Sequence, residues 1–582
     1  MGGFFMLRDG QGGQEALRAA RDQFSRHGFS GLVERRVPGW TIVHAPYIIG
    51  GPQLVTESGG DFAIAAGTLT HKGQIGPPAL QGWLAESTLP HVDRSKLAGQ
   101  FGAVLHRRGR TFILGDHLAC FPVYHDDGLN LFSTSLLAAA AALPRVTLDR
   151  QGLYEYAFHA SVLGDDTVLS EIKRLGPTQV IEVTAEGAQI HRVSNALPHE
   201  PSKASLADQL SAHSRLLHEV VGEQVRHFGD NVHCPLSGGL DSRLVLAVLR
   251  SLGCRPNVYV YGPASSSDVA VAKQIGKAEG FDVEWIEKER YRDITPDEFP
   301  EQVAQNFHEN DGTANFGGIF DNGGNSYARN KRHGSGSLAV SGGCGEIYRN
   351  FFFLPDRHLT ASAVADTFFS RFYRDDVTPM FDPRRYMTGI RDKILEAIGQ
   401  PGNNRPLQRQ VIEQIYPRVR GRSLFGREIS IDARYSPYIL PFLDHRVVAE
   451  AMTVPLRLKH AGHFESQLLN TIDPSLARRP SAYGHDFATP PSLGHRFRDW
   501  STSIRPTWLR KRSYAIRRRL RPVSDEHGGL FDPEYMGRVI DLQFPIMRRY
   551  FHLENMKDSG LWRRVACLEY LAAFLGAKLS VA

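Results

Sequence analysis

The chain has 582 residues, which predicts two or three domains of ordinary size. Hydrophobic residues make up 42% and charged residues 22%, as in a globular rather than a disordered protein. Lysine and arginine number 68 against 62 acidic residues, and an excess of +6 over this length argues against a nucleic-acid-binding protein.

The five cysteines are scattered, odd in number and contain no CxxC pair. This pattern argues against a disulfide framework or a structural zinc site and is typical of a reducing cytoplasm. The N-terminus shows no basic stretch followed by an apolar core. No stretch approaches the roughly 18 apolar residues of a membrane span. We therefore expect a cytoplasmic protein without a transmembrane segment.

Short β-rich segments separated by turn residues fill the first part of the chain. They are residues 42–50, 61–69, 102–107 and 111–117. Residues 180–193 then predict a closing hairpin with a Glu-Gly turn. We assign residues 1–195 to a first, mainly β domain.

A different pattern begins at residue 205, where residues 205–226 show helical periodicity. Short strands and helices then alternate: strands are predicted at 231–236, 257–262 and 282–287, and helices at 243–253 and 267–280. This alternation predicts a parallel sheet with helical crossovers. Residues 300–500 are mostly helical apart from a Gly-rich strand and turn at 334–346, and residues 501–582 are helical and basic.

The strongest local signal is the six-residue loop Ser237–Ser242, SGGLDS, between a predicted strand and a predicted helix. Its two glycines allow a tight turn and let backbone N–H groups approach an anion, and the following helix N-terminus adds a partial positive charge. Ser237 and Ser242 offer hydroxyl donors to phosphate oxygens. Asp241 cannot bind phosphate directly, so its expected role is to hold Mg²⁺. No Walker loop and no GxGxxG motif opening a helix is present.

This loop resembles the pyrophosphate loop of N-type ATP pyrophosphatases, and the chain over roughly 95–500 resembles the asparagine synthetase family. Three further segments carry the resemblance, in the same order as in the family: 259–280, 340–353 and 439–452. Upstream, residues 97–125 resemble late strands of the family's glutaminase-like domain. Gly262 would let the adenosine lie close, and Asp268 would cap the following helix.

The resemblance implies an α/β protein of three parts. Residues 1–195 would form an Ntn-hydrolase-like αββα sandwich, 205–500 a parallel-sheet ATP pyrophosphatase (PP-loop) domain with a helical C-terminal part, and 501–582 a helical, basic extension. ATP and Mg²⁺ would be the cofactors. The residues expected to bind ATP and pyrophosphate are Leu236, Ser237, Gly238, Gly239, Asp241, Ser242, Gly262, Ser341, Gly342 and Gly343. Asp241 and Glu346 would hold the metal ion.

The sequence departs from the family at the glutaminase site. The family has a catalytic cysteine directly after the initiator methionine, and here that position is Gly2. Glycine has no nucleophile, so we expect no glutamine hydrolysis by the family mechanism. The first domain would then be a retained scaffold.

The synthetase part also departs. Gly345 stands where the first residue of an acidic pair is expected, while Glu346 remains. Residues 478–487 lack the lysine that faces the adenylate in the family; Arg478 or Arg479 would supply the positive charge, or both are simply exposed. Tyr435, Ser436 and Tyr438 replace a Glu-Ala-Arg sequence, which indicates a changed acceptor pocket.

These features favour an ATP-dependent ligase that adenylates a carboxylate and couples it to ammonia or an amine. Glu346, Arg478 and Arg479 would be the catalytic residues. The carboxylate would belong to a small molecule, a saccharide or a peptide; an intramolecular variant would resemble β-lactam synthetase or lasso-peptide cyclase. Glutamine-dependent asparagine synthesis is a poor match to this sequence, because the catalytic cysteine is replaced by Gly2. The alternative is a non-catalytic nucleotide-binding or scaffold protein. A homo-oligomer is compatible with either.

Residues 505–522 carry eight arginines or lysines with Trp508 and Tyr514 between them. Such a stretch suits contact with a polyanion, an acidic membrane surface or an acidic saccharide. A solvated basic helix is the alternative that we favour.

Overall fold

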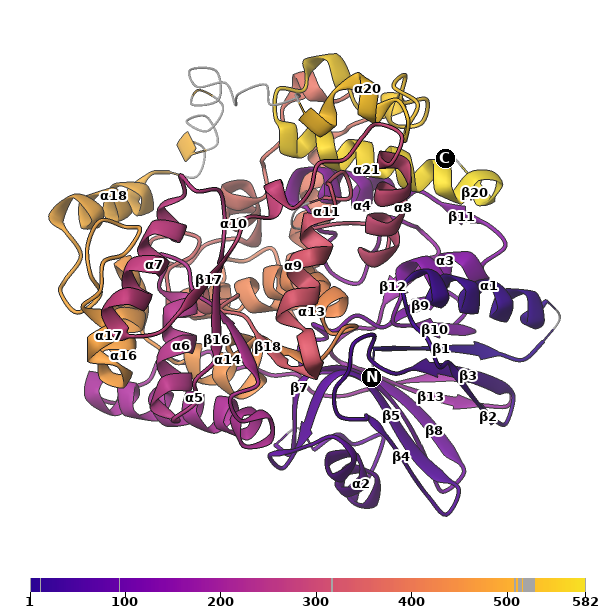
Figure 1. The fold of residues 1–582 in the computed structure, drawn as a ribbon, viewed down its shortest axis with the longest axis horizontal. Helices are drawn as coiled ribbons and strands as arrows, with labels where there is room; N and C mark the ends of the chain where they lie inside the picture. The colour runs from indigo at the N-terminus through magenta and orange to yellow at the C-terminus, as the bar shows by residue number, and fades with distance from the viewer. Residues whose placement is uncertain are drawn as a thin grey trace.

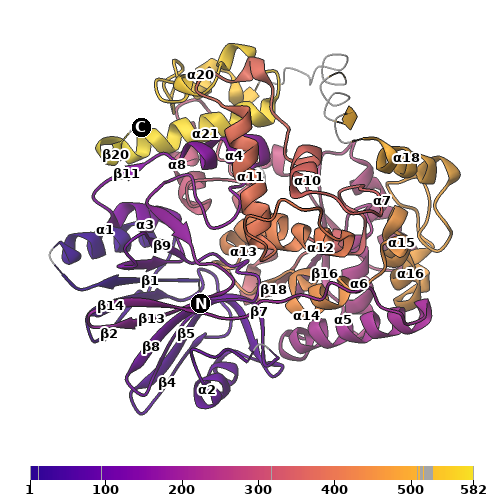
Figure 2. The same ribbon diagram turned by 180° about the vertical axis from the view of Figure 1, so that it is seen from behind.

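The computed structural model describes residues 2–10, 12–93, 95–315, 318–506, 509–510, 516 and 529–580. Two antiparallel sheets fill the N-terminal part, and a parallel sheet with helices follows (Figures 1 and 2). The predicted mixed α/β class with antiparallel and parallel sheets is therefore confirmed. Most of the basic stretch 505–522 lies outside the described residues.

The first antiparallel sheet places the N-terminal strand in its interior. Its order is β12 (Ile172–Arg174), β9 (Tyr124–Asp126), β10 (Leu131–Ser133), β1 (Gly3–Arg8), β3 (Trp40–Ala45) and β2 (Val33–Val37). Because β1 pairs with β10 on one side and β3 on the other, its backbone is hydrogen-bonded along both edges. Residues at the start of the chain are therefore held firmly in the core.

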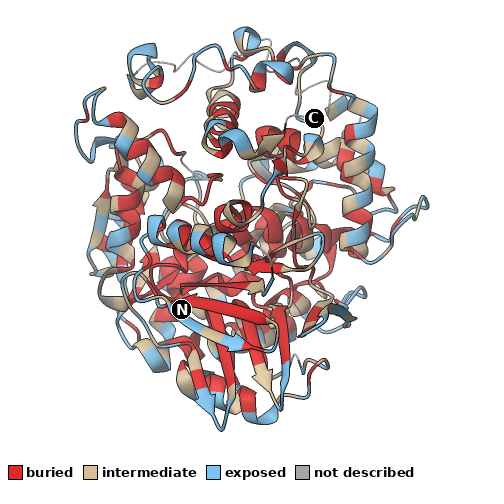
Figure 3. Cartoon of the chain, turned by 90° about the vertical axis from the view of Figure 1, so that its right-hand side faces the viewer, coloured by how far each residue is buried: buried red, intermediate tan, exposed pale blue. Residues whose placement is uncertain are grey.

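The second antiparallel sheet packs face to face with the first. Its order is β14 (Gly187–Arg192), β13 (Gln179–Thr184), β8 (Arg110–Gly115), β7 (Leu97–Arg107), β5 (Asp61–His71) and β4 (Val55–Ser58), with β6 (Gln74–Ile75) also paired to β5. Helices α1 (Gly13–Arg26) and α3 (Leu136–Ala142) cover the first sheet, and α2 (Pro77–Glu86) covers the second (Figure 1). The expected αββα layering is present. The inner strands β1, β3, β5, β7 and β8 are mostly buried, whereas the edge strands β2 and β14 are mostly not (Figure 3).

The parallel sheet has the order β17 (Val283–Ile286), β16 (Asn257–Tyr261), β15 (Val232–Pro235), β18 (Leu338–Val340) and β19 (Tyr438–Ile439). Helices α5 (Leu206–Phe228) and α6 (Asp241–Ser251) pack together, and α7 (Ser267–Glu279) lies against β16 and β17. The chain runs outward from β15 to β17 and then returns to β18 on the other side of β15. The strand order thus reverses between β15 and β18, which is where open parallel sheets bind ligands, beyond the carboxyl ends of their strands.

Helices fill the rest of the chain. In the middle region they are α4 (Arg150–His159), α8 (Phe299–Glu309), α9 (Gly324–Arg332), α10 (Ala361–Phe368), α11 (Pro383–Ala397), α12 (Arg409–Glu413) and α13 (Gly426–Asp432). Further along they are α14 (His445–Ala451), α15 (Leu456–Lys459), α16 (His463–Ile472), α17 (Pro474–Ala477), α18 (Leu493–Ile504), α20 (Pro533–Met536) and α21 (Ser559–Leu575). Among the described residues, none of the helices has both the length and the hydrophobicity needed to cross a bilayer.

The C-terminal end of the described chain returns to the first domain. Helix α21 packs against α4, and β20 (Leu579–Ser580) pairs in parallel with β11 (Val146–Thr147). The sequence predicted a helical extension at 501–582, and it predicted neither this short strand nor its partner. A two-residue strand carries too little periodicity to be read from sequence.

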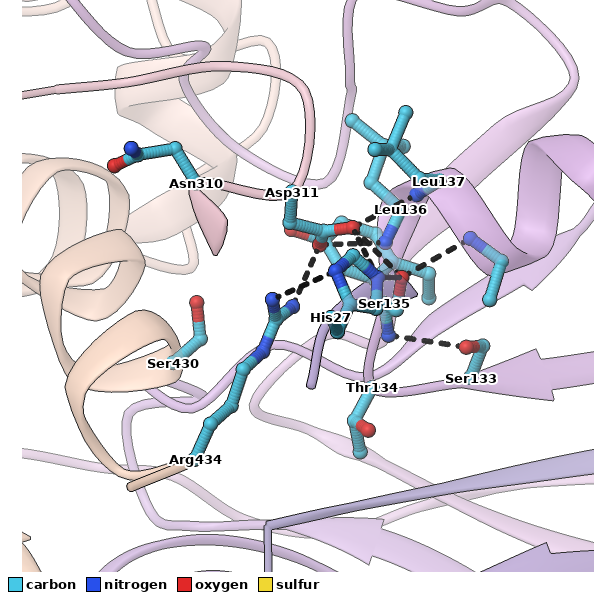
Figure 4. Close-up of polar contacts among 12 residues, drawn as sticks. His27, Ser133, Thr134, Ser135, Leu136, Leu137, Asn310, Asp311, Ser430 and Arg434 are labelled. Atoms are coloured by element: carbon cyan, nitrogen blue, oxygen red, sulfur yellow. Dashed lines mark hydrogen bonds and ion pairs between the residues drawn. The ribbon is translucent and has the colours of Figure 1, made fainter. Parts of the chain in front are cut away.

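A buried ionic cluster joins the N-terminal sandwich to the parallel-sheet half (Figure 4). The Asp311 carboxylate accepts hydrogen bonds from the Ser135 hydroxyl (2.7 Å) and from the N–H groups of Leu136 (2.8 Å) and Leu137 (3.0 Å) at the start of α3. It also pairs with Arg434 at 3.0 Å and Arg427 at 3.2 Å.

His27 completes this cluster, with its Nε2 atom 2.9 Å from the Ser135 hydroxyl. Serine, histidine and aspartate thus meet, but the His27 and Asp311 side chains are fully buried, and the Ser135 hydroxyl donates its hydrogen bond to Asp311. A substrate has no access to such a serine. The cluster therefore anchors the two halves to each other and does not form a hydrolase triad.

Candidate functional site

The loop that follows β15 has the predicted strand–loop–helix context. It is shaped by its own serines: the two hydroxyl oxygens of Ser237 and Ser242 are 3.0 Å apart, and Ser242 Oγ also accepts the Ser237 N–H at 3.0 Å. The Ser237 hydroxyl accepts the Gly239 N–H at 3.2 Å. The preceding residue, Leu236, continues the sheet by donating its N–H to the Tyr259 carbonyl at 2.8 Å.

The second glycine-rich motif, Ser341–Gly343, follows β18 and meets the first loop. A Cβ atom on Gly342 would lie 2.6 Å from the Ser242 nitrogen, so only glycine lets the two loops come together. The Ser341 N–H is held by the Ile439 carbonyl at 3.0 Å. We call the region where the loops Ser237–Ser242 and Ser341–Gly343 meet the switch-point crevice.

Gly262 ends β16 at the same edge of the sheet, with φ of +135°, a backbone conformation that favours glycine. Its carbonyl accepts the Trp285 indole N–H at 2.9 Å. The prediction that Asp268 caps α7 is wrong, because Ser266 is the capping residue and its hydroxyl accepts the Asp268 N–H. The Asp268 carboxylate instead accepts the Gly238 N–H at 2.9 Å, so it faces the loop.

The two predicted metal ligands are each engaged by another side chain. Asp241 forms an ion pair with Arg349, and the Glu346 carboxylate accepts the Tyr416 hydroxyl at 2.7 Å. Tyr416 begins a π-helical segment, Tyr416–Phe425, whose Gly421 packs close to Cys344. The described part of the chain has no group of three or more His, Cys, Asp or Glu side chains placed to hold a metal ion. In this arrangement, both predicted metal ligands are paired with side chains of the protein.

Arg349 is also bound to a second carboxylate: its Nε atom lies 2.7 Å from Glu465 Oε2. Burial raises the pKa of Glu465 well above its usual range, with Arg349 opposing that effect. Burial disfavours the charge on Arg349, but Asp241 and Glu465 outweigh it and raise the pKa of the guanidinium. Neither Arg349 nor Glu465 was predicted from the sequence as a site residue.

A cavity of about 300 Å³ opens beside the loop. It is lined by Leu240, Glu346, Arg349, Tyr483 and His485, among others. Lys459 also lines it and is fully buried; its Nζ atom donates to the Ile347 carbonyl at 2.8 Å and to Glu413 at 3.1 Å. Lys459 is thus a buried lysine at this cavity, and its ammonium group is held by a backbone carbonyl and by Glu413.

Arg478 and Arg479 do not reach the crevice, which corrects their predicted catalytic placement. Arg478 is exposed, and Arg479 pairs with Glu279 at 2.6 Å, at the end of α7 remote from the loop. Their segment reaches the loop through its backbone, because the Ala482 N–H donates to the Gly238 carbonyl at 3.0 Å.

The three residues at the expected acceptor pocket are buried. The Ser436 hydroxyl lies 2.6 Å from His333 Nδ1, and the Tyr438 hydroxyl donates to Glu428 at 2.6 Å. Tyr435 stacks on His333. Glu428 lines a charged cavity of about 320 Å³, together with Tyr261, Lys288, Arg329, Arg332 and Asp432. Tyr438 thus contacts the charged wall of this cavity through Glu428.

Gly2 has no room for a side chain. A Cβ atom there would lie 2.2 Å from the Phe29 ring, 2.8 Å from the Pro46 carbonyl oxygen and 3.0 Å from the Arg434 carbonyl oxygen. Two of these three neighbours are backbone atoms, which cannot rotate away. The space around this position is therefore filled by the protein itself.

We predict that Gly2→Cys destabilises the protein by about 1–3 kcal/mol, as expected for overpacking a core, and gains no glutaminase activity. Denaturant unfolding and release of glutamate from glutamine check the two parts. Gly10→Cys is the control, because a Cβ at Gly10 has no heavy atom within 4 Å. Glutamate release by the Gly2→Cys variant at an enzymatic rate would contradict the prediction.

No known protein family matches this sequence, and no curated protein is similar to it. Among solved structures, one similar chain is the allosteric regulatory enzyme of purine biosynthesis, with 11% identity and a TM-score of 0.24 over 50% of this chain and 67% of that one. Another is glutamine phosphoribosylpyrophosphate amidotransferase from B. subtilis, complexed with ADP and GMP, with 9% identity and a TM-score of 0.24 over 49% and 65%. These values do not establish a family.

Proposed function

We propose that the protein is an ATP-dependent ligase of the asparagine synthetase type, which activates a carboxylate as its adenylate and joins it to an amine or ammonia. The observation that carries this proposal is the meeting of two glycine-rich loops at the reversal of strand order, beyond the carboxyl ends of β15 and β18. The partial positive charge at the N-terminus of α6 favours an anion beside the loop.

In the proposed reaction, a carboxylate oxygen attacks the α-phosphorus of ATP, the bond to the bridging oxygen breaks, and pyrophosphate leaves. The amine nitrogen then attacks the acyl carbon, the acyl–oxygen bond breaks, AMP leaves, and the nitrogen loses a proton. The loop Ser237–Ser242 would hold the pyrophosphate. Glu346, which lines the neighbouring cavity, would orient the amine. Because Gly2 carries no nucleophile, the amine or ammonia would come from solution or from the substrate itself.

Gly239 offers the sharpest test of nucleotide binding. A Cβ atom there meets only the Ser237 and Tyr483 hydroxyls, at 3.3 and 3.7 Å, so the fold tolerates a side chain that enters the open side of the loop. Gly239→Val is expected to weaken ATP binding at least about tenfold, or 1.4 kcal/mol, by calorimetry. Gly10→Val is the matched control, and equal affinity of the two variants would count against the proposal.

Ligase activity is tested separately, by assaying pyrophosphate and AMP with ATP and a panel of carboxylates and amines. Release of both products that depends on a carboxylate, and that Gly239→Val abolishes, is the expected result.

A second candidate function is nucleotide binding without turnover. The ion pair between Asp241 and Arg349, together with Gly345 in place of an acid, favours it. Nucleotide binding with no pyrophosphate release across the panel would support this candidate over the ligase.

A further inference from the structure

The position beside Asp241, where a divalent metal ion would be expected, is taken by a side chain of the protein. Arg349 lies one residue beyond the short 3-10 helix Gly345–Tyr348 and reaches back to the Asp241 carboxylate. These two residues are 108 positions apart in the sequence. Both side chains remain partly open, with 22% and 24% of their surfaces exposed, so the pair stands at the edge of the cavity and not in the core.

Gly345 makes this arrangement possible. A Cβ atom on Gly345 would lie 2.2 Å from Asp241 Oδ1 and 2.6 Å from its Cγ. No real side chain tolerates such distances, so a second carboxylate at this position is incompatible with the observed place of Asp241. Gly345 and the ion pair between Asp241 and Arg349 therefore depend on each other through packing.

Glu465 fixes the guanidinium from the other side. Its carboxylate is fully buried and lies 2.7 Å from Arg349 Nε. A side chain held at both ends does not swing away easily, because release would leave a buried acid without its partner. A guanidinium has five N–H donors, and Asp241 and Glu465 each take one. Arg349 also lines the cavity, and arginine binds phosphate oxygens bidentately.

We propose that the Arg349 guanidinium takes the part of the divalent metal ion, so that the switch-point crevice binds a nucleoside triphosphate without Mg²⁺. This inference rests on the proposed function, because it concerns the same crevice and the same ligand. Mg²⁺ binding next to Asp241 would have to displace a cation that two carboxylates hold in place.

The first experiment uses the unmodified protein. ATP binding is measured by calorimetry with excess EDTA and again with excess Mg²⁺. The expected result is binding in EDTA with an affinity that Mg²⁺ does not improve. Binding that occurs only with Mg²⁺ overturns this inference and leaves the proposed nucleotide site intact, whereas no binding under either condition overturns both.

The second experiment removes the guanidinium. Arg349→Ala is expected to weaken ATP binding in EDTA by about ten- to a hundredfold, the range for losing charged hydrogen bonds. Adding Mg²⁺ should recover part of this loss, because the freed Asp241 carboxylate can then bind a metal ion. Arg457→Ala, at an exposed position on α15, is the matched control and should bind like the unmodified protein.

Arg349→Lys distinguishes the effect of the positive charge from the effect of the guanidinium geometry. It also provides a second variant in case Arg349→Ala does not fold. Lysine keeps one positive charge but lacks the planar fork, so intermediate binding in EDTA is expected. If Arg349→Ala and Arg349→Lys both bind ATP in EDTA as tightly as the unmodified protein, Arg349 does not replace the metal ion.

Discussion

Asp311→Asn is expected to lower the free energy of unfolding by about 3–5 kcal/mol, the cost of breaking a buried ion pair by removing one partner. The substitution keeps the size of the side chain. Asparagine also tolerates the left-handed backbone at this position, where φ is +50°, so the change isolates the charge. Arg427 and Arg434 would remain buried opposite a neutral amide, and α3 would lose the anion at its N-terminus.

Urea unfolding, followed by fluorescence, measures this loss. Asp297→Asn is the control, because the Asp297 side chain is 81% exposed and pairs with Arg538 at the surface. A change of less than about 0.5 kcal/mol in the Asp311 variant, as is usual for surface substitutions, would show that the cluster does not hold the two halves together.

Asp432→Asn is expected to cost a similar amount, about 3–5 kcal/mol, and to change the response of the protein to acid. Asp432 is 2% exposed at the end of α13, and its Oδ1 atom pairs with Arg332, with His333 at 3.1 Å and with Arg329 at 3.5 Å. Removing the charge leaves the buried Arg329 and the half-buried Arg332 without this partner. Because Asp432 and both arginines line the 320 Å³ cavity, the substitution should also remove the ion pairs that hold this cavity wall together.

The pH dependence follows from the direction of the pKa shift. Burial alone would raise the pKa of Asp432, but Arg332, the hydrogen bond from His333 and Arg329 hold it well below its usual range. A carboxyl group with a lowered folded-state pKa stabilises the fold above its unfolded pKa of about 3.9, and this contribution is lost as the pH falls below that value. The urea concentration at the midpoint of unfolding should therefore decrease less for Asp432→Asn than for the unmodified protein between about pH 4 and pH 2. Asp392→Asn, at an exposed position, is the control.

Several local features could be predicted from the sequence because they depend on neighbouring residues. The strand–loop–helix at β15 and α6 follows from an apolar run, two glycines and an amphipathic helix. The alternation of strands and helices predicted the parallel sheet, and turn-bounded β segments predicted the sandwich. β19, with two residues, could not be predicted, since its pairing comes from β18 and not from its own pattern.

The candidate site was predicted only in part. The two glycine-rich loops and Gly262 do lie at one edge of the sheet, as the order of motifs indicated. Arg478 and Arg479 were wrongly placed, because a basic residue near a motif carries no information about the direction of its side chain. Arg349 lies three residues after the predicted Glu346, yet nothing in the sequence showed that it would turn toward Asp241.

The sequence by itself determined which of the longer segments form strands and helices, where a glycine-rich strand-to-helix loop lies, and that Gly2 bears no nucleophile. These properties depend on short-range periodicity and on the chemistry of single residues. The tertiary structure alone decided that Asp241 meets Arg349 and Glu465, and that Asp311 joins the two halves. Such contacts join residues more than a hundred positions apart, and their free energies depend on burial, which exists only once the chain has folded.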